Sequence, residues 1–171
     1  MTLLAAFAVV ATVATTAMLA ATVDWGDTTI RLTISLLPFA VMHIVGSRVP
    51  RAVPSWLAFV SGLAMDVATH GPLGYWAAAY LAGLLITRAA SGITGKRPLA
   101  RIGLALAAIG VSVVAQAVLA SLYAWRPVDF STLLAGSLPL AAGLALLEPL
   151  IPADRRSTTF DARTAALRRG T

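Results

Sequence analysis

The chain has 171 residues, of which 58 % are hydrophobic and only 12 % are charged, and its mean hydropathy is +0.84. A soluble domain carries about 25 % charged residues, so this composition excludes an ordinary water-soluble globular domain and predicts an integral membrane protein. The formal net charge of +6 comes from basic residues that flank apolar segments and form no single basic face, so we expect no nucleic-acid partner.

Apolar segments bounded by charged residues, proline or glycine follow one another along the chain. In hydrocarbon each segment must be helical, because only a helix satisfies its own backbone hydrogen bonds without water. The sequence therefore predicts an all-α integral membrane protein, a compact bundle of six transmembrane helices over residues 1–151, followed by a basic tail over 152–171. The expected spans are about 3–23, 32–46, 53–68, 72–90, 102–125 and 130–151. The second and third are shorter than the roughly 20 residues that cross a bilayer comfortably.

The first segment has a rival interpretation as a cleaved signal peptide. Such peptides need a basic n-region and a short apolar core. Residues 1–23 contain no Lys or Arg and form a long apolar run, so we expect an uncleaved span.

Basic residues are distributed unequally between the connections. Cytoplasmic loops carry the excess of Lys and Arg, and here Arg31 and Arg126 alone fall on the opposite side. The other basic residues are Arg48, Arg51, Arg88, Lys96, Arg97, Arg101, Arg155, Arg156, Arg163, Arg168 and Arg169. Both termini are therefore expected in the cytoplasm. The tail either rests on anionic lipid or docks a cytoplasmic partner through a helix around 160–169.

One acidic residue, Asp66, stands within the third apolar segment. It follows Gly62 and Leu63 and precedes a turn that contains Gly71, Pro72 and Gly74. We expect Gly71 to end the helix and Pro72 to occupy the first turn of the next one, which directs free N–H groups towards Asp66. Two interpretations remain open. Asp66 is either a ligand for an ion, a substrate or a partner, or a carboxylate satisfied by those N–H groups that fixes the hairpin.

Other polar residues within the spans give weaker signals. His43, five residues after Pro38, is expected to bond a freed carbonyl, Gln116 to bond a neighbouring helix, and Glu148 to form an interfacial salt bridge. Pro38 and Pro139 interrupt two spans, and broken helices are also how transporters expose backbone to substrates.

Nucleophile–base pairs, metal-ligand clusters and phosphate-binding glycine loops are all missing from the sequence, and there is no cysteine. The prediction is a protein that is not an enzyme and that has no metal and no cofactor.

The stretch 50–86 resembles the bacterial rod shape-determining protein MreD family. The resemblance rests on Gly62, Leu63 and Asp66 at a fixed distance from Gly71, Pro72 and Gly74. It covers about forty residues, and elsewhere the likeness is only in length and six-span layout. These six residues are read as a structural motif or a partner-binding element.

The resemblance implies a non-enzymatic inner-membrane scaffold subunit of the machinery that elongates the cell wall. Its implied partner is an MreC-like single-span coiled-coil protein, within a complex containing an MreB-like filament, a RodA-type polymerase and a penicillin-binding transpeptidase. The fold of that family is similar to the S components of energy-coupling-factor transporters. This keeps a small-molecule-binding transporter subunit as the alternative, with a site lined by Asp66, His70, Tyr75 and Trp76.

Overall fold

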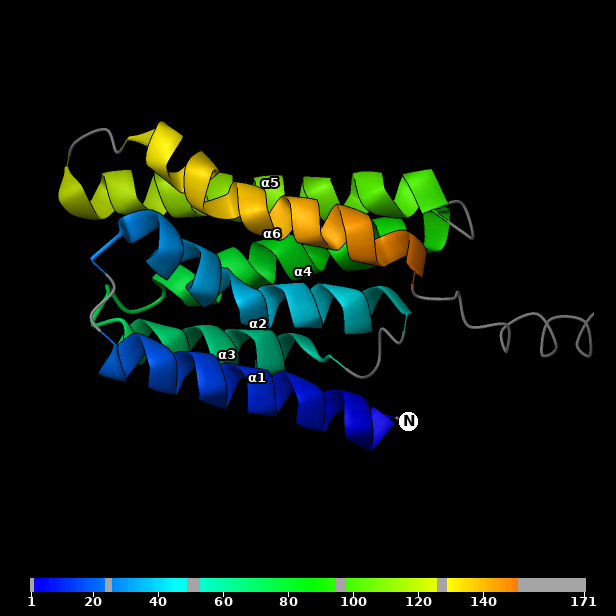
Figure 1. Ribbon diagram of the computed structural model, residues 1–171, viewed down its shortest axis with the longest axis horizontal. Coiled ribbons are helices and arrows are strands. Elements are labelled where there is room, and N and C mark those ends of the chain that lie inside the picture. Colours follow the sequence, from blue (N-terminus) through cyan, green and yellow to red (C-terminus); the bar gives the residue numbers. More distant parts are fainter. Residues whose placement is uncertain (1, 24–25, 49–52, 95–97, 126–128, 151–171) are drawn as a thin grey trace, which may run out of the picture.

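The computed structural model describes residues 2–23, 26–48, 53–94, 98–125 and 129–150, which form helices and no strand. These are α1 (Thr2–Thr22), α2 (Thr28–Arg48), α3 (Ser55–Ala68), α4 (Tyr75–Thr94), α5 (Pro98–Ala124) and α6 (Phe130–Leu150) (Figure 1). The all-helical prediction is thereby confirmed. Three stretches are long and apolar enough to cross a membrane: Thr28–Arg48, Leu99–Ala124 and Phe130–Leu147. Ala6–Thr22 and Ser55–Ala68 are shorter apolar helices.

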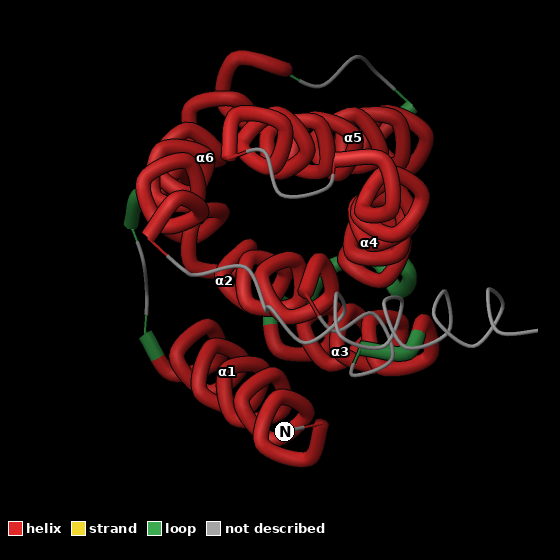
Figure 2. Tube along the Cα trace, turned by 90° about the vertical axis from the view of Figure 1, so that its right-hand side faces the viewer, coloured by secondary structure: helices red, strands yellow, loops and turns green. Residues whose placement is uncertain are grey.

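Consecutive helices run in opposite directions along the long axis of the molecule (Figure 1). The start of α1 and the end of α6 therefore lie at the same end. Seen along that axis, α2 lies centrally and packs against α1, α3, α4 and α6, while α5 packs against α4 and α6 (Figure 2). Three helices, α2, α4 and α6, begin at the end opposite the N-terminus, which we call the acidic end because aspartates cap them there.

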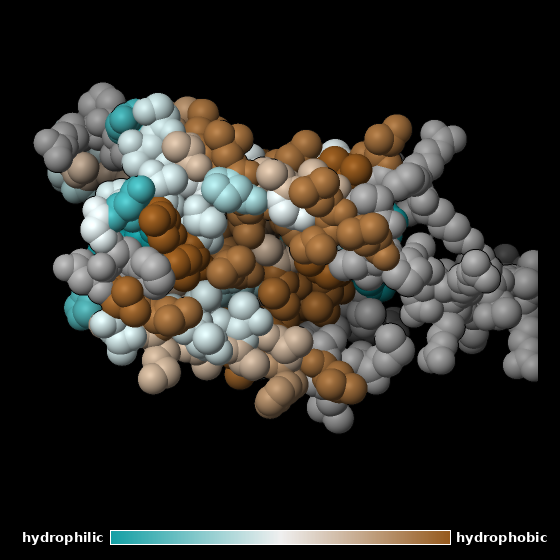
Figure 3. Space-filling view, viewed as in Figure 1, coloured by the Kyte–Doolittle hydropathy of each residue, from teal (hydrophilic) through white to brown (hydrophobic). Residues whose placement is uncertain are grey.

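Large apolar side chains are exposed on every helix. On the face in Figure 3, hydrophobic side chains spread across the middle and right-hand part of the described surface. Examples are Phe7, Leu37, Phe59, Leu85, Leu122 and Leu146. In water such a surface would favour aggregation, whereas in lipid it is the expected exterior. The surface is thus compatible with a membrane protein.

Hydrogen bonds between side chains and neighbouring helices tie α2, α4 and α5 together. Thr87 donates to the carbonyl of Gly83 at 2.9 Å, so the Nδ1–H of His43 donates to Thr87 Oγ1 at 2.8 Å. The expectation that His43 bonds a freed carbonyl is wrong, because its ring meets a hydroxyl on α4. Gln116 bonds across helices as expected, since its Oε1 accepts from the Tyr75 hydroxyl at 3.5 Å. The side chain of Glu148 lies outside the described residues.

Several helix boundaries differ from the expected spans. The second segment is longer than predicted, Thr28–Arg48 instead of 32–46. Asp27 caps its start, and the guanidinium groups of Arg31 and Arg48, which lie outside the predicted bounds, donate to carbonyl oxygens. The fifth begins earlier, at Pro98, where a proline suits a first turn. The third is short as predicted, at 14 residues. It is about 21 Å long, less than the hydrocarbon core of about 30 Å. The basic tail, 152–171, lies outside the described residues.

Candidate functional site

The turn between α3 and α4 contains most of the residues singled out in the sequence. We call residues 66–76 the α3–α4 joint. At the end of α3, the N–H of Gly71 donates to the carbonyl of Asp66 at 3.0 Å and the N–H of His70 to that of Val67 at 3.2 Å. This pair of bonds is a Schellman motif. The left-handed residue is His70, with φ +53°, so the expectation that Gly71 itself ends the helix is wrong.

The start of α4 is also displaced from the prediction. Helix α4 begins at Tyr75, and Pro72 lies before it instead of in its first turn. The carbonyl of Pro72 accepts from the N–H of Tyr75 at 3.2 Å, which closes a turn. Gly74 at this turn has φ +93°, a conformation that glycine adopts at no steric cost.

The carboxylate of Asp66 caps α4 from across the joint. Its Oδ2 accepts from the N–H of Gly74 at 2.8 Å and its Oδ1 from the N–H of Trp76 at 2.7 Å. The side chain is fully buried. An acidic group at a helix N-terminus satisfies otherwise unpaired N–H groups and interacts favourably with the helix dipole. Of the two interpretations left open by the sequence, the geometry matches the satisfied carboxylate that fixes a hairpin.

Gly62 lies one helical turn before Asp66 on the side of α3 that faces α4. A Cβ built there would overlap the backbone of Trp76 and Ala77. The two helices therefore touch backbone to backbone at this level, directly beneath the capped turn. Leu63, the next residue, is half-buried, and Pro72 is exposed. Of the motif residues, Gly62, Asp66 and Gly74 share this contact, while Leu63, Gly71 and Pro72 do not.

Two further side chains, which were not predicted from the sequence, stabilise the joint. Arg31, in the first turn of α2, donates from Nη2 to the carbonyl of Thr69 at 2.7 Å. Tyr123, near the end of α5, donates to the carbonyl of Leu73 at 2.9 Å. The signal for Arg31 was present in the sequence, because it is a rare basic residue on the side expected to be outside.

The fold separates the four residues expected to line a ligand site, Asp66, His70, Tyr75 and Trp76. Trp76 is 4 % exposed, with its ring 5.4 Å from that of Tyr75 and 6.0 Å from that of Tyr80. Asp66 is bonded to backbone, and His70 is exposed. Within the described ranges, no three His, Cys, Asp or Glu side chains are placed to hold a metal ion.

The other helices that begin at the acidic end are capped by aspartates within their own chain segment. Asp27 Oδ1 accepts from the N–H of Thr29 at 2.7 Å, at the start of α2. Asp129 Oδ1 accepts from the hydroxyl of Ser131 at 2.7 Å and from its N–H at 3.0 Å, at the start of α6. These hydrogen bonds lower the pKa of Asp129. The cap of α4 differs from both because it is buried and comes from another helix.

Comparisons of the chain with protein-family models, curated proteins and solved structures give no match.

The close contact at Gly62 predicts a large difference between two Gly→Ala substitutions. Gly62→Ala places a methyl group against backbone, and overpacking of this kind costs about 1–3 kcal/mol. Gly103→Ala on α5 is the matched control, because a Cβ there meets nothing within 4 Å. Thermal unfolding of the purified protein in mild detergent should show a lower midpoint for Gly62→Ala only. Equal midpoints for the two variants would contradict the backbone contact.

Proposed function

We propose that this chain is a non-enzymatic scaffold subunit of the bacterial cell-wall elongation machinery that maintains rod shape, embedded in the inner membrane. The observation that carries the proposal is the α3–α4 joint. Three of the six residues on which the resemblance to the MreD family rests, Gly62, Asp66 and Gly74, meet where α3 contacts α4, and Asp66 is bonded to backbone N–H groups at 2.7 and 2.8 Å. A carboxylate bonded in this way has a structural role and is not available to a ligand, which supports a scaffold over a ligand-binding subunit.

The membrane topology that we propose has six spans and cytoplasmic termini. Three stretches are long enough to cross a bilayer, and the remaining helices run alongside them (Figure 1). Among the described basic residues, Arg48, Arg88 and Arg101 lie towards the end opposite the aspartate caps. At that end, beside the start of the short helix α3, Arg88 donates to Ser55 Oγ at 2.6 Å and to the carbonyl of Val53. Positive charge at one end and acidic caps at the other favour the basic end facing the cytoplasm.

The proposed mechanism is mechanical coupling across the membrane. The joint fixes the pairing of α3 with α4, and α4 and α5 are tied by the hydrogen bond from Ser112 Oγ to the carbonyl of Ala79 at 2.7 Å. A bundle whose helices are tied together in this way provides a rigid binding surface for the membrane helix of an MreC-like coiled-coil partner. Through that partner it would couple an MreB-like filament inside the cell to a RodA-type polymerase and a penicillin-binding transpeptidase outside.

Co-purification and depletion test this function. In mild detergent the tagged protein should retain an MreC-like single-span coiled-coil chain, identified by mass spectrometry. Depletion of the protein should turn rod-shaped cells into rounded ones, because wall synthesis loses its attachment to the filament. Normal rods after complete depletion would contradict the proposal.

One observation favours the alternative, a small-molecule-binding subunit of a membrane transporter. In the described part of the chain, the side-chain amide nitrogen of Gln116 and the hydroxyl of Ser35 are buried without a hydrogen-bond partner. Buried polar atoms of this kind are usually satisfied by water or a ligand. Both belong to helices that surround Tyr80, whose hydroxyl donates to the carbonyl of Ser35.

A ligand screen distinguishes the two functions. A ligand at 100 times its dissociation constant stabilises a protein by about 2.7 kcal/mol, which shifts the thermal midpoint measurably. We expect no shift with a panel of vitamins. A specific shift that is lost in Gln116→Leu would favour the transporter subunit over the scaffold.

A further inference from the structure

Four helices close a ring around the interior of the bundle. Helix α4 packs against both α2 and α5, and α6 packs against the same two helices from the other side, so α2 and α5 stand opposite each other (Figure 2). Neighbouring packed helices are about 8–10 Å apart, which places opposite members of such a ring about 11–14 Å apart. Side chains must therefore fill the distance between α2 and α5.

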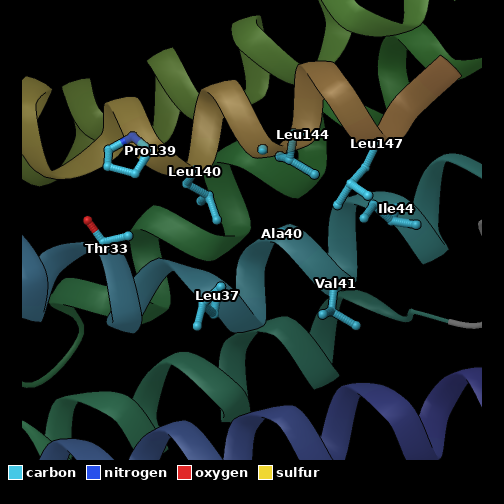
Figure 4. Close-up of a pocket in the computed structure, with 10 residues that line it drawn as sticks. Thr33, Leu37, Ala40, Val41, Ile44, Pro139, Leu140, Leu144 and Leu147 are labelled. Carbon is cyan, nitrogen blue, oxygen red and sulfur yellow. The ribbon is translucent and has the colours of Figure 1, made fainter. Parts of the chain in front are cut away.

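The side of α2 that meets α6 is apolar. Six aliphatic side chains line a groove between these two helices: Leu37, Val41, Ile44, Leu140, Leu144 and Leu147 (Figure 4). Thr33 is the polar residue of the lining, and its Oγ1 lies 2.6 Å from the carbonyl of Gly136 on α6. Ser35 lies instead on the side of α2 that faces α4, where its carbonyl accepts from the hydroxyl of Tyr80. The buried polar groups discussed below therefore face the interior of the ring and not this groove.

Side chains from α2 and α5 meet over Gly83 of α4. A Cβ built at Gly83 would lie 2.4 Å from Phe39 Cζ on α2 and 2.6 Å from Ser112 Oγ on α5. The lack of a side chain at Gly83 thus lets an aromatic ring and a hydroxyl group from opposite helices come together. Ser112 also donates to the carbonyl of Ala79, one turn earlier in α4, at 2.7 Å.

One turn nearer the acidic end, Ser35 and Gln116 take the corresponding positions. Ser35 precedes Phe39 by four residues on α2. Gln116 follows Ser112 by four residues on α5. Because α2 and α5 run in opposite directions (Figure 1), both steps lead towards the acidic end and keep the side chains on the same faces. Ala79 is again a small residue of α4, so Ser35 and Gln116 face the same part of the interior.

Both of these polar side chains are buried and incompletely hydrogen-bonded. Ser35 is 0 % exposed and Gln116 is 1 % exposed. Among the described residues, Ser35 Oγ and Gln116 Nε2 have no hydrogen-bond partner. Gln116 Oε1 is 3.5 Å from the Tyr75 hydroxyl, which is long for an O–H···O bond. Turning the amide over would only exchange the atom that is left unpaired. Since an unpaired buried polar atom is costly, a further partner is expected at this point.

The tightness of the packing determines the size of this partner. A cavity that held an organic molecule would expose the side chains that line it, whereas Phe39, Ala79 and Tyr80 are 0 % exposed. A single water molecule needs little space and bonds to about two to four polar groups. We infer that one buried water molecule lies between α2 and α5 and accepts hydrogen bonds from the hydroxyl of Ser35 and the amide of Gln116.

This water links the two members of the ring that are not neighbours. Water-mediated hydrogen bonds are nearly as favourable in enthalpy as direct ones, so the link stabilises the pairing of α2 with α5. It also satisfies both polar atoms without a substrate. The inference goes beyond the scaffold function and does not depend on the identity of any protein partner.

Synchrotron footprinting of the full-length protein in mild detergent detects the water directly. X-rays convert a bound water molecule into hydroxyl radicals, which oxidise adjacent side chains even where bulk water does not reach. Tyr80 should be oxidised, while Met65, equally buried on α3 and chemically more reactive, should not be. An unoxidised Tyr80 would overturn the inference. Oxidation of both residues would overturn it as well, because the interior would then be open to solvent.

Two substitutions test the residues that bind the water. Ser35→Ala and Gln116→Leu each remove one of its hydrogen bonds, so each should lower the thermal midpoint. The double variant should lower the midpoint by less than the sum, because both changes act on one water molecule, and it should lose the oxidation of Tyr80. Ser137→Ala is the matched control, since this buried serine on α6 donates to the carbonyl of Leu134 in its own helix and its loss should leave Tyr80 oxidised.

Two other results would contradict the water site. Higher or unchanged midpoints for Ser35→Ala and Gln116→Leu would show that both atoms are dry, because removing an unpaired buried polar group relieves its desolvation. A small organic molecule that native mass spectrometry finds on the unsubstituted protein and not on Gln116→Leu would replace water as the occupant. The oxidation of Tyr80 in the unsubstituted protein needs no variant and so decides the question even if a substitution prevents folding.

Discussion

The carboxylate of Asp66 and the first N–H groups of α4 form the interaction on which the arrangement of α3 and α4 depends. A helix that begins within apolar surroundings leaves N–H groups that water cannot reach, and each unpaired group costs several kcal/mol in hydrocarbon. Asp66 satisfies two of them from the preceding helix. The backbone carbonyl of Asp66 also accepts the Schellman hydrogen bond from the N–H of Gly71. One residue therefore takes part in ending α3 and in capping α4. The backbone contact at Gly62 then becomes possible one turn below.

The other two helices that begin at the acidic end are also capped by carboxylates, in a simpler form. Helices α2 and α6 are capped by Asp27 and Asp129, each within two residues of the N–H that it binds. The turn between α3 and α4 contains no aspartate, and the cap of α4 comes instead from Asp66 near the end of α3. Arg31 completes the joint by donating to the carbonyl of Thr69, which adds a cation at the C-terminal end of α3. The acidic groups at the helix N-termini and the basic group at the C-terminus of α3 all interact favourably with the helix dipoles.

Composition and spacing predicted what depends on solvent and local chemistry. The apolar runs predicted the helices, and the distance from Asp66 to the Gly-Pro turn predicted a carboxylate facing free N–H groups. Details that depend on tertiary contacts were not predictable. The left-handed residue is His70 and not the neighbouring glycine, and the turn is held by contacts from Asp66 on α3 and Arg31 on α2. His43 meets Thr87, and Trp76 is buried between Tyr75 and Tyr80, only because α4 packs on α2 and α3.

Amide hydrogen exchange in Asp66→Asn tests the joint most directly. Asparagine keeps the shape but presents an NH₂ group to one of the two backbone donors, so one hydrogen bond is lost and a donor is left buried. This costs about 1–3 kcal/mol. Asp129→Asn is the matched control, because asparagine caps a helix as well as aspartate does. The account predicts faster exchange at Gly74 or Trp76 in Asp66→Asn and unchanged exchange at Ser131 in Asp129→Asn. Unchanged exchange at both Gly74 and Trp76 would show that Asp66 does not hold α3 and α4 together.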